Sequence, residues 1–189
     1  RRQRQMCIRD SRLLANTIAT GAGLFVLITA FANISGAHLN PFVSLSMYLT
    51  KRIKGKELLT FIPAQILGCL LGVMLANVFF EHSIIELSTK NRDGFHIFLS
   101  EIVATFGLIF IIFATLKDGK TTVAACVATY ISAGYWFTSS TSFANPAVAI
   151  ARTFTDSFTG INYLNTPTYI FAELLGAIVA IYIIKRLIK

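Results

Sequence analysis

Two asparagine-proline pairs carry the side chains best placed to act on a ligand. Asn40 and Pro41 lie in the segment GAHLNPFVSL, and Asn145 and Pro146 lie in SFANPAVAI. Proline suits the first position of a helix because its missing N–H would have no partner there. Asparagine before it is a good N-cap, since its side-chain oxygen accepts a backbone N–H. Each asparagine then keeps its NH₂ group, with two donors, for a molecule that accepts hydrogen bonds.

The elements that hold these asparagines are too short to cross a membrane. Each pair opens an apolar piece near 41–50 or 146–154, whereas a spanning helix needs about 20 residues. We therefore expect two re-entrant half-helices that meet at their N-termini. Backbone outside a helix is tolerated at membrane depth only beside protein or a watery cavity, which predicts a cavity lined by Asn40 and Asn145. The helix dipoles make this point partly positive, which favours neutral solutes and repels cations.

The composition predicts an all-α polytopic membrane protein. Of the 189 residues, 54% are hydrophobic and only 14% are charged, against about 25% charged residues in soluble domains. Five further apolar stretches are long enough to cross the bilayer: 13–32, 58–80, 96–116, 121–139 and 168–188. No stretch alternates polar and apolar residues in the way a membrane β-strand would.

The net charge of +8 is arranged for a membrane and not for nucleic acid. Three regions on one side of the predicted topology hold nine of the 17 basic residues: Lys51, Arg52, Lys54, Lys56, Lys117, Lys120, Lys185, Arg186 and Lys189. The other side holds four: Arg12, Lys90, Arg92 and Arg152. The positive-inside rule therefore predicts a cytoplasmic C-terminus, with the basic residues facing acidic lipid headgroups.

The two halves of the chain repeat each other. PAQILGCLLG begins 23 residues after Asn40, and FAELLGAIVA begins 26 residues after Asn145. An odd number of full spans separates the copies, so the repeat is inverted, with its site at the bilayer midplane. Glu101 precedes Asn145 by 44 residues, and the same count back from Asn40 falls before residue 1. We therefore expect that the partner of span 96–116, a first transmembrane helix, is missing.

With SGAH before the first pair, and AQILG and AELLG after the two pairs, this pattern resembles the aquaporin (major intrinsic protein) family. The resemblance covers residues 13–188. It implies six spans, two half-helices, one pore in each subunit of a homotetramer in the cell membrane, and no cofactor or enzymatic activity. No catalytic triad, metal-binding cluster or phosphate-binding loop is visible in the sequence.

Residues 1–11, RRQRQMCIRDS, resemble the conceptual translation of a sequencing-library adapter. They lack the apolar core of a signal peptide. We therefore expect the channel domain to comprise residues 12–189.

The resemblance also assigns the narrowest part of the pore. The family's selectivity filter falls on four positions: Thr20, Ala133, Ser142 and Val148. A slip of one residue would replace Ala133 by Ser132 or Gly134. The family usually has arginine where this chain has Val148. All four filter positions then carry small or medium neutral side chains, which predicts a wide, weakly polar constriction.

Further site residues follow from the same resemblance. Ala147 completes the second motif, whereas Phe42 replaces the alanine of the first motif and either turns into the protein or narrows the pore. Glu101 is expected to hold the second re-entrant loop through backbone N–H groups. Arg152 either gives the outer vestibule a positive charge or pairs with Asp156 at the surface. Six backbone carbonyls are expected to line the path: Gly36, Ala37, His38, Thr141, Ser142 and Phe143.

The function expected from these features is a passive channel for small neutral solutes. The segment NPAVAIARTFTDSFTGI resembles bacterial aquaporins associated with arsenic resistance, which implies undissociated arsenite as the solute. The alternatives are a glycerol, urea or water facilitator and, in another class, an ion-coupled secondary transporter. A coupled transporter would need an ion-binding carboxylate at the midplane, and the sequence predicts none beside either asparagine.

Overall fold

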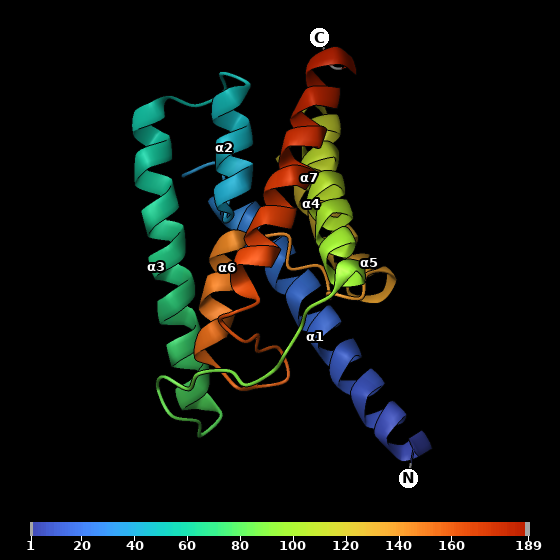
Figure 1. Ribbon diagram of the computed structural model, residues 1–189. Coiled ribbons are helices and arrows are strands. Elements are labelled where there is room, and N and C mark those ends of the chain that lie inside the picture. Colours follow the sequence, from blue (N-terminus) through green and yellow to red (C-terminus); the bar gives the residue numbers. More distant parts are fainter. Residues whose placement is uncertain (1, 188–189) are drawn as a thin grey trace.

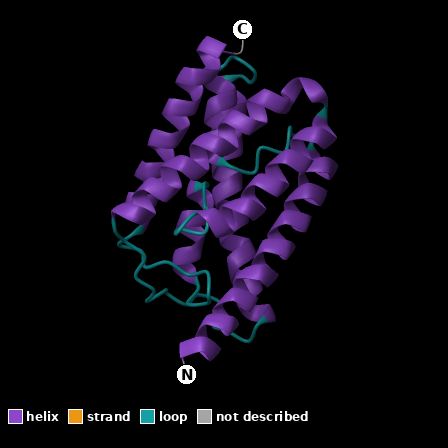
Figure 2. Cartoon of the chain, turned by 90° about the vertical axis from the view of Figure 1, so that its right-hand side faces the viewer, coloured by secondary structure: helices purple, strands orange, loops and turns teal. Residues whose placement is uncertain are grey.

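The computed structural model describes residues 2–187, and within this range the chain is helical with no strand (Figure 2). The elements follow in the order α1 (Arg2–Phe31), α2 (Pro41–Leu49), α3 (Gly55–Phe79), α4 (Phe95–Thr115), η1 (Leu116–Asp118), α5 (Lys120–Phe137), α6 (Pro146–Ala151), η2 (Arg152–Phe154) and α7 (Thr166–Leu187). Residue 188 of the last expected span, and Arg1 and Lys189 among the basic residues, lie outside the described range.

Four of the long helices are apolar enough to cross a membrane: Arg9–Phe31, Gly55–Phe79, Phe95–Asp118 and Thr166–Leu187. The fifth expected span, 121–139, corresponds to α5, which has 18 residues. At 1.5 Å per residue α5 is about 27 Å long, slightly short of the hydrocarbon thickness. Its hydroxyl-bearing residues, such as Thr121 and Thr129, also make it less apolar than the other four helices.

The two re-entrant pieces are short helices, as their spacing predicted. α2 runs from Pro41 to Leu49, and α6 continues through η2 to Phe154. In Figure 1 their N-termini face each other near the middle of the molecule, and the two helices extend away in opposite directions. The turn between α2 and α3 lies at the same end as the C-terminus, whereas the loop after α3 lies at the opposite end. This arrangement agrees with the inverted repeat.

Close helix packing depends on glycine at particular positions. A Cβ atom added to Gly176 of α7 would lie 2.4 Å from the carbonyl oxygen of Ile102 in α4. A Cβ at Gly21 of α1 would lie 2.2 Å from Oγ of Ser132 in α5. The pairs α4–α7 and α1–α5 therefore approach closely because these glycines have no side chain, as small residues permit in membrane helices.

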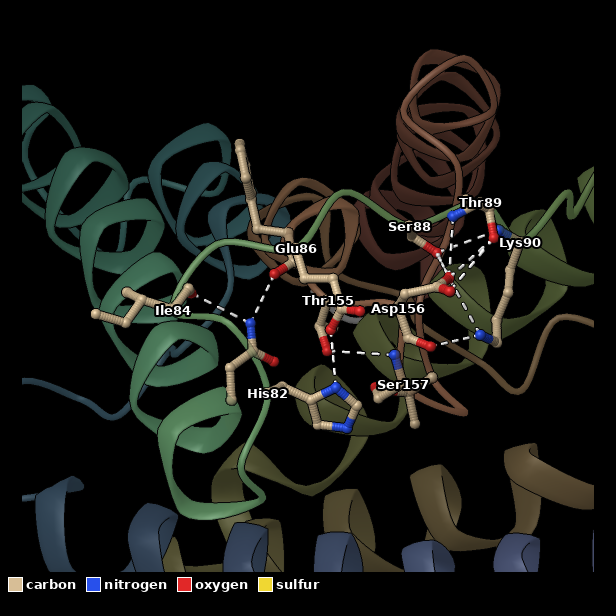
Figure 3. A network of polar contacts seen from close by, with 12 residues as sticks. His82, Ile84, Glu86, Ser88, Thr89, Lys90, Thr155, Asp156 and Ser157 are labelled. Atoms are coloured by element: carbon tan, nitrogen blue, oxygen red, sulfur yellow. Dashed lines mark hydrogen bonds and ion pairs between the residues drawn. The ribbon is translucent and has the colours of Figure 1, made fainter.

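Two loops at the end opposite the C-terminus are joined by Asp156 (Figure 3). Its Oδ1 accepts the backbone N–H of Thr89 at 2.9 Å and the ammonium group of Lys90 at 3.1 Å. Ser88 contributes a further hydrogen bond to the same oxygen, and its N–H donates to the carbonyl of Thr153 at 2.9 Å. The N–H of Thr89, and then Lys90, hold the pKa of Asp156 below its ordinary value. We call these contacts of residues 88–90 with 153–156 the loop clasp.

Gly176→Ala should destabilise the fold, because its methyl group would meet backbone atoms that cannot rotate away. We expect a loss of about 1–3 kcal/mol, typical of overpacking, measured as a lower melting temperature of the intact gene product in detergent. Gly23→Ala is the control, since a Cβ there has nothing within 4 Å. Equal melting temperatures for the two variants would contradict the close approach of α4 and α7.

The loop clasp should weaken in acid. A carboxyl group whose pKa is lowered by folding contributes stability above its unfolded pKa, and this stability is lost as the pH falls through the folded-state value. We expect hydrogen-exchange protection of the Thr89 amide to persist below pH 3.8, the ordinary value for aspartate, and then to disappear. Asp156→Asn should lower protection at neutral pH and remove this pH dependence, whereas Asp93→Asn should change neither. Unchanged protection in Asp156→Asn would show that the carboxylate does not hold the loop.

Candidate functional site

The two asparagines cap their half-helices and also bind each other's loops. Oδ1 of Asn40 accepts the N–H of Phe42 at 2.9 Å, and Oδ1 of Asn145 accepts the N–H of Ala147 at 3.1 Å. Nδ2 of Asn40 donates to the carbonyl of Ala144 at 2.6 Å. Nδ2 of Asn145 donates to the carbonyl of Leu39 at 2.9 Å. The contacts of one half of the repeat are therefore repeated in the other.

These contacts correct the expectation that each amide offers two free donors. One N–H of each NH₂ group already binds the opposite loop, so only one remains for a solute. The partners are about a hundred positions apart in sequence, with separations of 104 and 106 residues, so local spacing could not indicate them.

The loops before the caps have an unusual backbone. In the first loop Ala37 and Leu39 have φ values of 48° and 50°, and in the second Ser142 and Ala144 have 52° and 47°. Side-chain-bearing residues seldom adopt this left-handed region, which costs about 1–3 kcal/mol at each position. The residues with positive φ lie one, three and four positions before each asparagine, since Gly36 and Thr141 also belong to this set, so the two loops follow the same backbone path.

The left-handed residues leave most carbonyls of the two loops unbonded. The carbonyls of residues 36–38 and 141–143 accept no hydrogen bond from the part of the chain that the structure describes, unlike those of Leu39 and Ala144. Five of the six expected carbonyl residues line the central cavity, and Thr141 lines a separate hollow with His96 and Ser139. The backbone therefore offers free acceptors along the cavity.

Two buried carboxyl groups support the second loop. Glu101, on α4, is fully buried and accepts the N–H groups of Phe143 at 2.9 Å and Ala144 at 2.8 Å. This is the arrangement that the resemblance implied. Glu173, on α7, is equally buried and accepts the N–H of Asn145 at 3.0 Å. Carboxyl oxygens thus accept hydrogen bonds from three consecutive amides of the loop.

Sequence reasoning missed Glu173, although the repeat contained the signal. Glu173 in AELLG occupies the position of Gln65 in AQILG. Nε2 of Gln65 donates to Oγ of Ser44 at 2.9 Å, and Nδ1 of His38 lies 3.1 Å from the same oxygen. The equivalent side chain supports the re-entrant segment in each half, with an amide in the first and a carboxyl group in the second.

The cavity runs between the half-helices and reaches the faces of α1, α4 and α5 that point toward them. Among the expected site residues it is lined by Thr20, Gly36, Ala37, His38, Asn40, Ser142, Phe143, Asn145 and Val148. A second hollow shares Gly36 and His38 with it and continues to Arg52 and Lys120. The two hollows together form a path from the middle of the molecule toward the end that carries the C-terminus.

The motif residues around the asparagines pack away from this path. Pro41, Pro146 and Ala147 are buried and do not line the cavity. Phe42 is half-buried and packs against the hydrophobic core, so it turns into the protein and does not narrow the pore.

Ala133 does not reach the cavity, which corrects the residue assigned by spacing. It is exposed, whereas Val127, Ile131 and Tyr135 present the cavity face of α5 at intervals of four residues. Ala133 lies two residues from Tyr135, about 200° around the helix, and therefore faces away. The hydroxyl of Tyr135 lies 3.0 Å from that of Thr20 across the cavity.

Gly134, one of the two alternatives, faces the second loop. A Cβ atom there would lie 2.7 Å from Cβ of Ser142, so only glycine permits this contact. Of the three positions considered on α5, Gly134 is therefore the one that lies against Ser142, an expected filter residue.

The structure also corrects the expectation that no acidic residue lies beside the asparagines. Glu173 directly contacts the backbone of Asn145, but neither Glu173 nor Glu101 lines the cavity. Both carboxyl groups face the loop backbone, so they do not offer an ion a site on the path. In the described residues, no group of three or more histidine, cysteine, aspartate or glutamate side chains could hold a metal ion.

The end of the cavity near η2 contains a charged residue. Arg152, in η2, lines the cavity together with Val148 and Asn145. Asp156 is bound by Thr89 and Lys90 in the loop clasp, so the expected alternative of a surface pair with Asp156 is not formed.

Comparison with known proteins agrees with this geometry. The family described as Major intrinsic protein matches residues 2–140. The chain is 45% identical over 177 residues to Aquaglyceroporin AqpS of Rhizobium meliloti (strain 1021), across 94% of this chain and 76% of the relative. It is 27% identical to Aquaporin-4 of Bos taurus and 26% identical to Aquaporin-4 of Homo sapiens, across 87% of this chain in each case. It spans about half, 53%, of the length of these two relatives.

Since the family match covers most of the chain and a relative is 45% identical across 94% of it, this protein belongs to the major intrinsic protein (aquaporin) family, whose members are multi-pass membrane proteins that act as passive channels for small neutral solutes and not as enzymes.

Proposed function

We propose that this protein is a passive channel whose constriction admits neutral solutes larger than water. The observation that carries the proposal is the uncharged Val148 beside Ser142 in the cavity. Arginine at position 148 would fill part of this space and bind passing oxygen atoms through its five donors. Valine leaves the space open and removes the charge from this level of the pore.

The remaining side chains at this level suit hydroxylated solutes. Hydroxyl groups of Thr20, Tyr135 and Ser142 line the cavity, and each can donate or accept a hydrogen bond. The Oγ atom of Ser142 is buried on the side of Gly134 and has no hydrogen-bond partner among the described residues. Asn40 and Asn145 each contribute one further donor.

Undissociated arsenite and glycerol both fit this chemistry. Each is neutral and carries three hydroxyl groups, which could replace water along the line of carbonyls and hydroxyls. The name of the relative AqpS, an aquaglyceroporin, favours glycerol. The segment after Asn145, which resembles aquaporins associated with arsenic resistance, favours arsenite.

A coupled transporter is a weaker proposal than a passive channel. The carboxyl groups of Glu101 and Glu173 bind loop amides and do not line the path. A coupled transporter needs a site that binds and releases an ion during each cycle.

The membrane arrangement is also part of the proposal. The basic residues near 51–56 and at the C-terminal end of α7 support a cytoplasmic location for that end of the molecule, in the cell membrane. Apolar side chains of α3, including Leu67, Leu71 and Leu75, are exposed and suit lipid or a neighbouring subunit of a homotetramer.

Val148→Arg should narrow the constriction and discriminate against large solutes. Stopped-flow swelling of vesicles that contain the intact gene product should show glycerol and arsenite fluxes falling about tenfold or more, and water flux falling much less. A change of tenfold corresponds to about 1.4 kcal/mol. Val148→Ala is the matched control and should retain all three fluxes. If assembled Val148→Arg transports glycerol and arsenite like wild type, Val148 does not lie at the gate.

The orientation can be tested by cysteine labelling in intact cells, in a background without the native cysteines. Lys54→Cys should be protected from a membrane-impermeant reagent, because the nine basic residues on its side favour the cytoplasm. Asn91→Cys, in the loop between α3 and α4, should react. Labelling of position 54 without labelling of position 91 would contradict the proposed topology and indicate the opposite orientation.

A further inference from the structure

Arg152 is held in a defined position at the outer end of the cavity. Its guanidinium carbon lies 4.2 Å from the centre of the Phe143 ring. That ring is itself fixed, because it packs on Tyr169 at 5.0 Å and its backbone N–H donates to Glu101. A stacked guanidinium gains cation–π energy and loses little freedom when it binds a ligand.

No carboxylate of the described residues forms a salt bridge with this charge. Asp156, four residues later, is held by the N–H of Thr89 and by Lys90. Because Asp156 binds the loop clasp, it does not neutralise the charge of Arg152. Nη1 of Arg152 is buried and makes no hydrogen bond with the described part of the chain. A buried donor without a partner is costly, so this side of the guanidinium group is not stabilised by a hydrogen bond.

The placement of this charge relative to the constriction is specific. Arg152 lies one helical turn after Val148, which is about 6 Å along the axis. Val148 and Arg152 both line the same cavity. A solute that enters from the outer end therefore passes the guanidinium group before it reaches the neutral side chains of Val148, Ser142 and Thr20.

We propose that Arg152 is the charge-selecting residue of the pore, placed one turn outside a neutral constriction. The guanidinium repels cations and donates hydrogen bonds to the oxygen atoms of neutral hydroxylated solutes, while size selection occurs at Val148. The pore thus separates two tasks, charge selection and size selection, between two levels. This inference rests on the proposed function, because it presupposes that the cavity conducts small neutral solutes.

Urea and the guanidinium ion provide a direct test. Urea and guanidinium are both planar and of similar size, but only guanidinium is charged. In vesicles that contain the intact gene product, wild type should take up urea and exclude guanidinium. Arg152→Gln should raise guanidinium uptake relative to urea uptake about tenfold or more, because a charge a few ångströms from the path is lost. Arg152→Lys should behave like wild type, and Val148→Arg combined with Arg152→Gln should exclude guanidinium again.

Arg92→Gln is the matched control. Its guanidinium carbon lies 5.8 Å from the same Phe143 ring, but Nη2 donates to the carbonyl of Phe158 at 2.8 Å and the residue does not line the cavity. The ratio of guanidinium to urea uptake should therefore stay at the wild-type value. Arg152→Met, which keeps an unbranched stem over Phe143, repeats the test if Arg152→Gln assembles poorly by size-exclusion chromatography.

The outcomes separate the two proposals. Wild type conducting urea and glycerol, with Arg152→Gln and Arg152→Met excluding guanidinium to the same extent as wild type, would contradict the role of Arg152. The proposed channel function would then still stand. If wild type conducts neither neutral solute, the proposed function itself fails. A ratio that rises equally in Arg92→Gln would also overturn the inference, because the effect would then not be specific to the cavity.

Discussion

Two half-helices begin in the middle of this membrane protein, and hydrogen bonds from Asn40 to Ala144 and from Asn145 to Leu39 hold their N-termini together. A helix N-terminus has unpaired N–H groups, and hydrocarbon offers them nothing. The side-chain oxygen of each asparagine accepts an N–H of its own helix, and its side-chain nitrogen donates to a carbonyl of the opposite loop. The N-termini can therefore face each other without burying unpaired groups, and the left-handed loops before them follow from this arrangement.

The two loops are supported by different chemical groups. The first depends on neutral groups around Ser44, whereas the second binds the carboxyl groups of Glu101 and Glu173 through three consecutive amides. The second loop also contains Ser142 and leads into Val148, so both proposed constriction residues lie in the half of the repeat that the two carboxyl groups support.

Local features of the sequence predicted much of this structure, and contacts between distant segments account for the errors. Asn-Pro spacing gave the starts of α2 and α6 because a cap and its proline are neighbours in sequence. Counting residues placed Ala133 at the filter, but the rotation of α5 brings Tyr135 to the cavity and Gly134 to the loop. The pairing of Asp156 depends on a loop about 66 residues away, and the donors of the asparagines depend on the opposite half of the chain.

The contact between Gly134 and Ser142 links two positions that lie on different segments. A methyl group at 134 would lie 2.7 Å from the β-carbon of residue 142, so position 134 cannot gain a side chain while residue 142 keeps its place. The position of the second loop beside α5 thus depends on both residues. Among relatives with different solute preferences, the two positions should covary in volume, and a single enlarging substitution should displace the loop instead of simply filling the pore.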